Sequence, residues 1–380
     1  MTSFADLGLA QPLLAALTSL QYEHPTPIQA QAIPPIMLGR DLQGIAQTGT
    51  GKTAAFALPI LHRLMVEKKQ PARKQARVLV LSPTRELASQ IAQSFRDYGR
   101  QTGLRVALMF GGVPKMKQSK AVANGIDILV ATPGRLMDHM QDGAINLTGV
   151  EVLVLDEADH MLDLGFIIPI KKIVQAIPPK RQTLFFSATM PKEIAALAGQ
   201  MLRDPVRVAV TPVATTADRV EQRVMFVETS KKRALLADLL KDSRMSRTLV
   251  FTRTKHGADR VTQHLEAAGQ PTAAIHGDKS QPQRERALQA FKDGRVRVLV
   301  ATDLASRGID VDGVTHVINF DLPNVPEAYV HRIGRTARAG NGGIAISFCD
   351  ASERPHLRGI EKLIQARLEV DEVRDVRRAA

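Results

Sequence analysis

A short aliphatic run that ends in carboxylates is the feature that most limits how this chain can fold. Residues 152–155 read Val-Leu-Val-Leu, and three acids follow directly, namely Asp156, Glu157 and Asp159. A continuous branched apolar run is typical of a strand buried on both faces of a parallel sheet. Such sheets bind ligands outside the carboxyl ends of their strands, where these acids would lie. Because neighbouring carboxylates repel one another, we expect a hard cation here, and oxygen ligands suit Mg²⁺.

An upstream segment has the features of a phosphate-binding loop. Residues 46–53 read AQTGTGKT, with Ala46 in place of the usual first glycine. The glycines allow backbone N–H groups to converge on phosphate oxygens. Lys52 would reach the β- and γ-phosphates, and the Thr53 hydroxyl would bind Mg²⁺ beside Asp156. The predicted nucleotide contacts of the loop are Thr48, Gly49, Thr50, Gly51, Lys52 and Thr53. The loop and the acid-tipped strand together predict a nucleoside triphosphate with Mg²⁺.

The charge balance points to a polyanionic partner. The 380 residues carry 51 basic and 38 acidic side chains, a net charge of +13. An excess of this kind is typical of proteins that bind nucleic acid or an anionic membrane surface, and general solubility is the alternative. Only 4% of residues are aromatic and none is Trp. Base stacking needs aromatic faces, so contacts to the phosphate backbone are favoured.

Composition also predicts a protein of the reducing cytoplasm. Hydrophobic residues make up 44% of the chain, and no apolar run approaches the roughly 20 residues that span a bilayer. The N-terminal residues lack the basic and apolar regions of a signal peptide. The single cysteine, Cys349, ends an apolar run, so we expect a buried thiol and no internal disulfide.

An internal repeat predicts two related α/β domains. Residues 77–81 resemble residues 247–251, and the sequence LVAT occurs at 129–132 and again at 299–302. Both pairs lie 170 positions apart. Each copy is a short strand followed by a helical pattern, which predicts parallel sheets flanked by helices. We expect domains over 1–210 and 220–372, a linker over 211–219, a closing amphipathic helix across 357–368 and a frayed tail over 373–380.

Further motifs carry a resemblance to a known family. They read PTPIQ (25–29), PTRELA (83–88), GG (111–112), TPGR (132–135), SAT (187–189), FTRT (251–254), QPQR (281–284), ATD (301–303), SRGID (306–310) and HRIGRTAR (331–338). With the loop and the acids, this ordered set resembles the DEAD-box RNA helicases of superfamily 2 over nearly the full length. It is most similar to the bacterial RhlE type. The resemblance implies two tandem RecA-like domains, ATP and Mg²⁺ as cofactors, and RNA as the partner.

The first motif would select the base. An amide both donates and accepts, which matches the N6/N7 edge of adenine. Gln29 is therefore the candidate for ATP selectivity, with Phe4 packing near the base. The alternative places Gln29 merely in the first helical turn after Pro27. The family usually has glycine where Gln21 stands, which leaves the local turn open.

The resemblance implies an RNA-binding track along both domains. The first-domain motifs follow strands, and strand-to-helix junctions offer N–H groups to phosphates. Singly, any of them could be a routine turn. The predicted RNA contacts are Pro83, Thr84, Arg85, Gly111, Gly112, Thr132, Pro133, Gly134, Arg135, Arg253, Gln281, Arg284 and Thr302.

The resemblance also implies a set of coupling residues and a pair of arginine fingers. Hydroxyls of Ser187 and Thr189 would hydrogen-bond the 156–159 segment and couple hydrolysis to unwinding, although Thr189 could instead cap the helix at 192–200. The predicted coupling residues are Asp159, Ser187, Thr189 and Arg307, and Asp310 would contact the ribose. Arg335 and Arg338 resemble arginine fingers, because three-residue spacing places them on one helical face. His331 belongs with them, and Ala337 replaces a common glycine.

The predicted activity is an RNA-stimulated, Mg²⁺-dependent ATPase. Asp156 would hold the metal and Glu157 would orient or deprotonate the attacking water. The phosphate loop and the arginine fingers belong to different domains, so RNA that binds both would favour domain closure and hydrolysis. Closure would locally separate short duplexes or remodel RNA–protein complexes. Sequence specificity should be low, because the contacts are to the RNA backbone. The resemblance points to ribosomal or RNA-decay assemblies as partners, a monomeric core and no membrane. A DNA-directed translocase and a non-enzymatic ATP-gated RNA clamp are the rival hypotheses.

Overall fold

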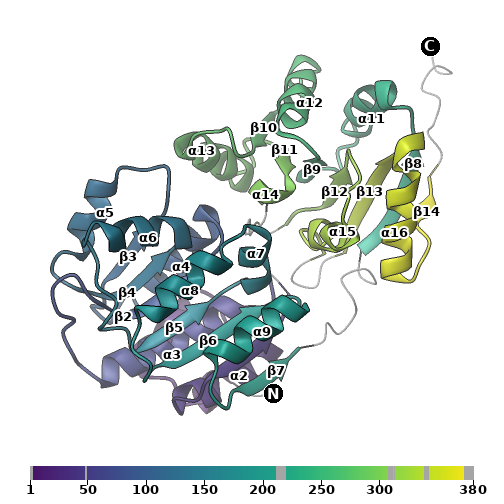
Figure 1. Ribbon diagram of the computed structural model, residues 1–380. Coiled ribbons are helices and arrows are strands. Elements are labelled where there is room, and N and C mark those ends of the chain that lie inside the picture. The colour runs from purple at the N-terminus through teal and green to yellow at the C-terminus, as the bar shows by residue number, and fades with distance from the viewer. Residues whose placement is uncertain are drawn as a thin grey trace. The chain divides into compact units, whose positions relative to one another are not determined.

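The computed structural model describes residues 3–47, 49–210, 220–306, 311, 313–337 and 342–371. The chain divides into two compact units, Met1–Thr211 and Pro212–Ala380. Figure 1 draws the first unit in purple to teal and the second in green to yellow. Each contains a parallel seven-stranded sheet flanked by helices, so the predicted fold class is confirmed. The predicted linker (211–219) and tail (373–380) lie outside the described residues.

The first unit has the strand order β3-β4-β2-β5-β6-β1-β7. Its strands are β1 (Leu42–Ile45), β2 (Ala76–Leu81), β3 (Val106–Met109), β4 (Ile126–Ala131), β5 (Val152–Leu155), β6 (Gln182–Ser187) and β7 (Val206–Ala209). Its helices are η1 (Ala5–Leu7), α1 (Gln11–Ser19), α2 (Pro27–Met37), α3 (Lys52–Val66), α4 (Arg85–Tyr98), α5 (Lys115–Val122), α6 (Pro133–Gln141), α7 (Ala158–Asp163), α8 (Ile167–Gln175) and α9 (Lys192–Met201).

The second unit has the strand order β10-β11-β9-β12-β13-β8-β14. Its strands are β8 (Val220–Phe226), β9 (Thr248–Thr252), β10 (Thr272–Ile275), β11 (Val298–Thr302), β12 (His316–Asn319), β13 (Gly343–Cys349) and β14 (Glu369–Val370). Its helices are η2 (Thr229–Lys231), α11 (Lys232–Leu239), α12 (Lys255–Ala267), α13 (Gln281–Lys292), α14 (Asp303–Ser306), α15 (Pro326–Ile333), η3 (Ala351–Glu353) and α16 (Arg354–Ile364).

The sequence repeat corresponds to equivalent positions in the two sheets. Strands β4 and β2 stand second and third in the first sheet, and β11 and β9 stand second and third in the other. The repeated segments lie on these four strands. The two units are therefore built on one topology, as the repeat predicts.

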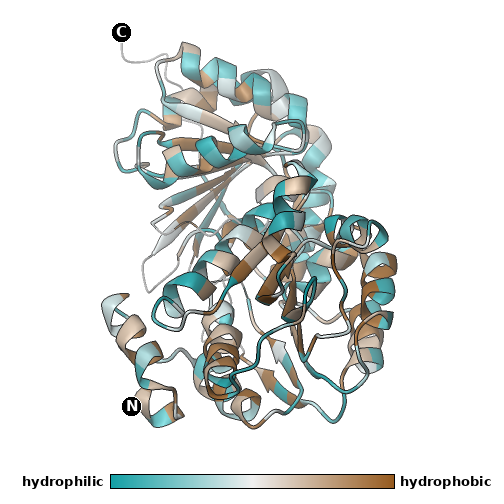
Figure 2. Ribbon diagram, turned by 90° about the vertical axis from the view of Figure 1, so that its left-hand side faces the viewer, coloured by the Kyte–Doolittle hydropathy of each residue, from teal (hydrophilic) through white to brown (hydrophobic). Residues whose placement is uncertain are grey.

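The acid-tipped run is a central strand buried on both faces. In β5, Val152 and Val154 contribute to one hydrophobic core and Leu153 and Leu155 to the other. Alternate side chains of a strand point to opposite faces, so a strand between two helical layers must be apolar throughout. In Figure 2 the strands in the middle of the first unit are largely brown, whereas the helices around them carry both teal and brown segments. The buried parallel strand predicted from the sequence is confirmed.

The C-terminal helix is shorter than predicted. α16 ends at Ile364, and Gln365 follows in the left-handed conformation (φ 55°). Leu357 and Ile360 are buried as expected, whereas Leu363 is exposed and Leu368 reaches the core from beyond the helix. The apolar residues keep helical spacing beyond Gln365, but the left-handed backbone of Gln365 ends the helix.

Cys349 ends β13 and is buried, as predicted. Burial raises the pKa of its thiol to about 11. Among the described residues, no helix is both long and apolar enough to cross a membrane.

Candidate nucleotide and RNA site

The acids after β5 form a buried cluster of ionisable groups. Asp156 is only 2% exposed. Burial raises the pKa of its carboxyl to about 7, against the opposing charge of Lys52 and with the repulsion of Glu157 and Asp159. The ionised form is therefore disfavoured unless a cation is supplied.

These residues fit Mg²⁺ bound together with a polyphosphate. Among the described residues no group of three or more His, Cys, Asp or Glu side chains could hold a metal alone. Mg²⁺ is commonly held by one or two carboxylates, with phosphate and water oxygens as its other ligands. Asp156 supplies such a carboxylate, and Thr53, half-buried in the first turn of α3, supplies a hydroxyl.

The phosphate loop runs from β1 into α3. Gly49 and Gly51 adopt positive φ angles of 86° and 91°, which side chains with a Cβ rarely adopt. Lys52 begins α3 and is buried, and its Nζ donates to the Ala46 carbonyl at 2.7 Å. Thr50 Oγ1 donates to the Gln47 carbonyl at 2.8 Å. The ammonium group therefore lies within the loop at the N-terminus of a helix, as anion binding requires. Thr48 lies outside the described residues.

Gln29 is tied to the phosphate loop. It lies in the first turn of α2, where its Oε1 accepts from the Thr26 backbone N–H at 2.9 Å. Its Nε2 donates to the Gly51 carbonyl at 3.2 Å. Thr26 Oγ1 donates to the Thr50 carbonyl at 2.8 Å. The helical-turn alternative is thus correct for the backbone, and the side chain also contacts the loop. Sequence analysis missed Thr26, although its spacing from Gln29 is that of a capping box.

Phe4 is a core residue in this structure. Its ring is 4% exposed and packs against Tyr22, with the centroids 6.3 Å apart. Little of its surface is left for a base. Gln21 has a φ of 60°, which explains why glycine suits this turn.

Glu157 has an unusual backbone and a histidine neighbour. Its φ of 53° is left-handed, and its N–H donates to Asp156 Oδ1 at 3.0 Å. Strained backbone of this kind concentrates at functional sites. His160 Nδ1 lies 3.3 Å from Glu157 Oε2, and both side chains are buried. His160 was not identified from sequence, although it lies one helical turn beyond Glu157.

The 156–159 segment contacts the SAT motif, as predicted. Asp159 Oδ2 accepts from the backbone N–H and from the hydroxyl of Thr189, each at 2.8 Å. The Asp159 N–H donates to Ser187 Oγ at 3.2 Å. Pro191, with no side-chain cap, precedes α9, so the capping alternative for Thr189 is wrong. Arg307 lies outside the described residues.

The predicted RNA residues of the first unit gather around the glycine pair. A Cβ on Gly112 would overlap the Arg85 guanidinium, so glycine lets the two segments meet. Arg135 Nη1 donates to the Val113 carbonyl at 2.9 Å. Thr84 caps α4 and Thr132 precedes α6, whose first residue is Pro133. Pro83 is buried beside them, and Gly134 is exposed. The junction geometry inferred from the sequence is therefore present.

Two buried side chains that sequence analysis missed support this loop. Gln118 Nε2 donates to the Phe110 carbonyl at 2.9 Å, and its Oε1 lies 3.2 Å from His139 Nε2. Burial, with nearby Arg135 and Lys115, lowers the pKa of His139. The glycine pair is thus held from both α5 and α6. A buried polar pair leaves no periodic signal in a sequence.

In the second unit, Arg253 is less available than predicted. Its Nη2 donates to Glu353 Oε1 at 2.7 Å and to the Leu322 carbonyl at 3.1 Å. Thr302 ends β11, half-buried. Gln281 is buried at the start of α13 and donates to Glu285 at 3.0 Å, and Arg284 lies one turn further on.

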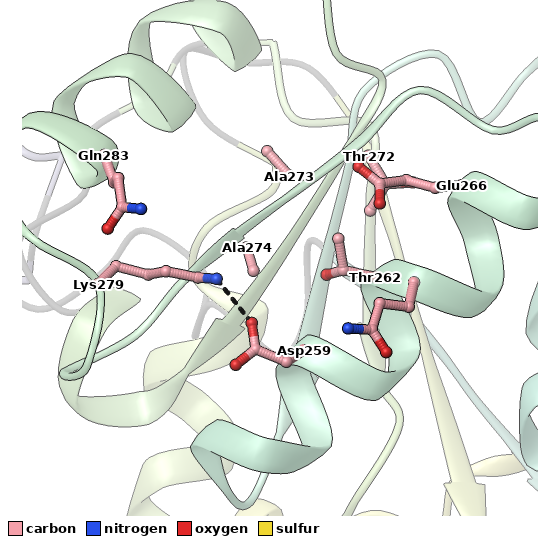
Figure 3. A pocket seen from close by; sticks show the side chains of 9 residues that line it. Asp259, Thr262, Glu266, Thr272, Ala273, Ala274, Lys279 and Gln283 are labelled. Carbon is pink, nitrogen blue, oxygen red and sulfur yellow. Dashed lines mark ion pairs between the residues drawn. The ribbon is translucent and has the colours of Figure 1, made fainter.

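A polar pocket of about 330 Å³ lies beside that turn, between α12, β10 and the start of α13. Lys279 Nζ lies 2.8 Å from Asp259 Oδ1, an ion pair that Figure 3 marks with a dashed line, and Gln283 also lines the pocket. None of the predicted nucleotide or RNA contacts lines this pocket.

The arginine motif is not one helical face. α15 ends at Ile333, so Arg335 lies in the turn after the helix, buried, and the predicted helical placement is wrong. Arg338 and Asp310 lie outside the described residues. Half-buried His331 is in the last turn of α15. Ala337, where the family has glycine, has a φ of 56°.

The remaining described arginine of this motif, Arg332, stabilises the fold, a role that sequence analysis missed. Arg332 is buried and pairs with both Asp303 oxygens at 2.5 and 2.7 Å. It also donates to Asn319 at 3.1 Å and stands 5.1 Å over the Phe251 ring.

Parallel sheets that carry a phosphate loop and an acid-tipped strand define a nucleotide-binding protein of the RecA-like class. Residues 26–197 match the DEAD/DEAH box helicase family, and residues 231–340 match the helicase conserved C-terminal domain. The chain is 44% identical over 367 residues to DEAD-box ATP-dependent RNA helicase 30 of Arabidopsis thaliana, covering 96% of this chain and 62% of that protein. It is 42% identical over 365 residues to ATP-dependent RNA helicase CshA of Limosilactobacillus reuteri, covering 96% and 72%. The structure of S. cerevisiae Dbp5 bound to RNA and ADP BeF3 is similar, with a TM-score of 0.85, 30% identity and coverage of 99% and 97%. The chain belongs to the DEAD-box ATP-dependent RNA helicase family.

Proposed function

We propose that this protein is an RNA-stimulated ATPase that converts ATP and water to ADP and phosphate and locally separates short RNA duplexes or remodels RNA–protein complexes. The observation that carries the proposal is the convergence of the Lys52 loop with the acids after β5 in one unit. Family membership and the RNA-bound neighbour add independent support.

The proposed roles follow from the geometry of the first unit. Mg²⁺, held by Asp156 and Thr53, would neutralise charge on the β- and γ-phosphates. Lys52 binds the same phosphates. Glu157 accepts a proton from the attacking water at its carboxylate, with His160 fixing that carboxylate from 3.3 Å. Gln29 would contact the base, and Phe4, which packs in the core, would support that site from behind.

Turnover would need residues from both units. Arg335 and Arg338, with His331, would stabilise charge on the transferring phosphoryl group, and Asp310 would hold the ribose. Arginine fingers contribute about 10³–10⁵ in rate, so the chain without RNA should be nearly inactive. RNA that contacts both units would favour the closed, active arrangement. Asp159, Ser187, Thr189 and Arg307 would couple hydrolysis to strand separation.

RNA would bind through its backbone with little sequence preference. Phosphate release is measured with ATP and Mg²⁺ alone, with single-stranded RNA and with single-stranded DNA. The proposal predicts strong stimulation by RNA and weak stimulation by DNA. Equal stimulation by DNA would favour a DNA-directed translocase, and RNA binding without hydrolysis would favour an ATP-gated clamp.

We further propose an RhlE-type, cytoplasmic, monomeric catalytic core that acts on ribosomal or RNA-decay assemblies. The motif pattern supports the RhlE assignment, whereas the relatives named above are CshA and helicase 30. The single buried cysteine suits a reducing compartment.

A further inference from the structure

The two units place a buried lysine at the same topological position. Strands β1 and β8 each stand sixth in their sheets. The first α-helix after each strand, α3 or α11, begins with a lysine, Lys52 or Lys232. Both lysines are buried, Lys232 at 1% exposure. In the first unit this position is the phosphate loop.

The neighbouring strands supply equivalent groups as well. Strands β5 and β12 each stand fourth in their sheets. Asp156 and Glu157 follow β5, and Asp321 follows β12. The Lys52 charge acts on Asp156, and Lys232 Nζ lies 3.9 Å from Asp321 Oδ1. The second unit therefore keeps the lysine and acid of a nucleotide site.

The anion at this second position is a side chain of the protein. Glu353 Oε2 accepts from Lys232 Nζ at 2.5 Å and from the Asp350 N–H at 3.2 Å. Its Oε1 accepts from Arg253 Nη2 at 2.7 Å and from the Leu322 N–H at 3.0 Å. Two cations and two backbone N–H groups thus surround one buried carboxylate. Converging donors of this composition are those that bind phosphate oxygens.

The connection before Lys232 is also unlike a phosphate loop. Residues 227–231 read VETSK and contain no glycine. Thr229–Lys231 form the short helix η2, where a phosphate loop would have left-handed glycines. Thr229 Oγ1 donates to Asp350 Oδ2 at 2.8 Å and fastens this connection to the end of β13. The backbone therefore does not wrap a phosphate here, whereas the side-chain donors remain.

We propose that the second unit contains a phosphate-type oxyanion site that the Glu353 carboxylate fills permanently, so that removing this carboxylate opens a site for an inorganic oxyanion between Lys232 and Arg253. The carboxylate takes the place that a phosphate would occupy and prevents a second nucleotide from binding. This inference is independent of the ATPase proposal, because it concerns only the second unit.

The test uses the full chain with Glu353→Ala. Buried Lys232 then loses its nearest counter-ion and keeps only Asp350 at 3.5 Å and Asp321 at 3.9 Å, while the more exposed Arg253 loses its carboxylate partner. The melting temperature of the second unit should therefore fall by on the order of 10 °C. Hydrogen–deuterium exchange should rise at α11 and at η3. Inorganic phosphate at tens of millimolar should reverse both effects by binding linkage, whereas chloride at equal ionic strength should not. The exchange of these two segments reports on the second unit even if phosphate also binds the Lys52 loop.

Matched variants separate this site from an ordinary buried ion pair. Glu151→Ala removes a carboxylate that pairs with buried Arg77 in the first unit, and phosphate should not restore it. Adding Lys232→Met to Glu353→Ala should abolish the phosphate response. The proposal would be overturned if chloride restored the melting temperature and exchange of Glu353→Ala as well as phosphate does. It would also be overturned if phosphate stabilised Glu151→Ala or the double variant equally. If Glu353→Ala does not fold in chloride, refolding yields in phosphate and chloride are compared, and the same outcomes decide.

Discussion

The contact between Gln29 and the phosphate loop gives the sharpest test of the nucleotide site. Gly51 has a φ of 91°, and a Cβ built on it would overlap Gln29 Nε2. Gly51→Ala therefore adds both backbone strain and a steric conflict. Gly39 has a φ of 75° and nothing within 4 Å of its Cβ position, so Gly39→Ala adds strain alone.

The energetic costs of the two substitutions should differ by the free energy of the hydrogen bond between Gln29 and the Gly51 carbonyl. Left-handed alanine costs about 1–2 kcal/mol at either position. At Gly51 the Gln29 side chain must also move, which breaks its bond to the Gly51 carbonyl and costs about 1 kcal/mol more. Buried Gln29 cannot move without disturbing Thr26, whose hydroxyl binds Thr50. Since roughly 1.4 kcal/mol is tenfold in affinity, this additional cost of about 1 kcal/mol should weaken ATP binding by Gly51→Ala about fivefold relative to Gly39→Ala.

The measurement is the dissociation constant of ATP by titration calorimetry for wild type, Gly51→Ala and Gly39→Ala. Gly39→Ala should lower the melting temperature and leave ATP affinity within about twofold, because its strain is remote from the loop. If Gly51→Ala binds ATP as tightly as Gly39→Ala, then the Gln29 contact does not shape the nucleotide site.

Thr189→Val removes the hydroxyl that donates to Asp159, and one charge-assisted hydrogen bond is worth about 1.5–3 kcal/mol. The rate of strand separation should fall about tenfold while the rate of phosphate release stays within a few-fold. Equal loss of both rates would contradict a coupling role. Ala337→Gly should raise the free energy of unfolding of the second unit by about 0.5–1 kcal/mol, measured by urea denaturation. Glycine relieves the left-handed strain at this position, and its extra conformational entropy in the unfolded chain costs less than that strain. A loss of stability would contradict this reasoning. Burial lowers the pKa of His139, so the unfolded chain takes up that proton more readily than the folded one. First-unit stability should therefore decrease as pH falls through the ordinary histidine pKa of about 6.5, and His139→Leu should flatten that dependence in thermal melts from pH 5 to 7.5; an unchanged slope would contradict it.

The parts predicted from sequence are those that local pattern dictates. The run Val152–Leu155 had to be a strand buried on both faces, because each face of β5 meets a core. Left-handed glycines and a helix-starting lysine are likewise local requirements of the phosphate loop. The hydroxyls of the SAT motif hydrogen-bond with Asp159 because β5 and β6, which precede the two segments, are neighbours in the sheet.

Other features depend on where helices end and on partners that are distant in the sequence. Arg335 was assigned to a helical face by its spacing, but α15 ends at Ile333 and the chain turns at Gly334. The RNA contact predicted for Arg253 stays a prediction, whereas its pairing with Glu353, 100 residues away, has no signal in the sequence. Such tertiary pairings follow from sheet topology, which residue spacing does not contain.

The most direct test of the central claim is the rate of ATP cleavage by wild type and Glu157→Gln in a single turnover at saturating RNA. Glutamine keeps the size of the side chain and cannot accept the proton of the attacking water. The account predicts that wild type cleaves ATP in an RNA-dependent manner, whereas the variant retains ATP and RNA in a stable complex with cleavage slowed by at least about 10²-fold. If Glu157→Gln cleaves ATP at the wild-type rate, Glu157 is not the base, and the function assigned to the acid-tipped strand is wrong.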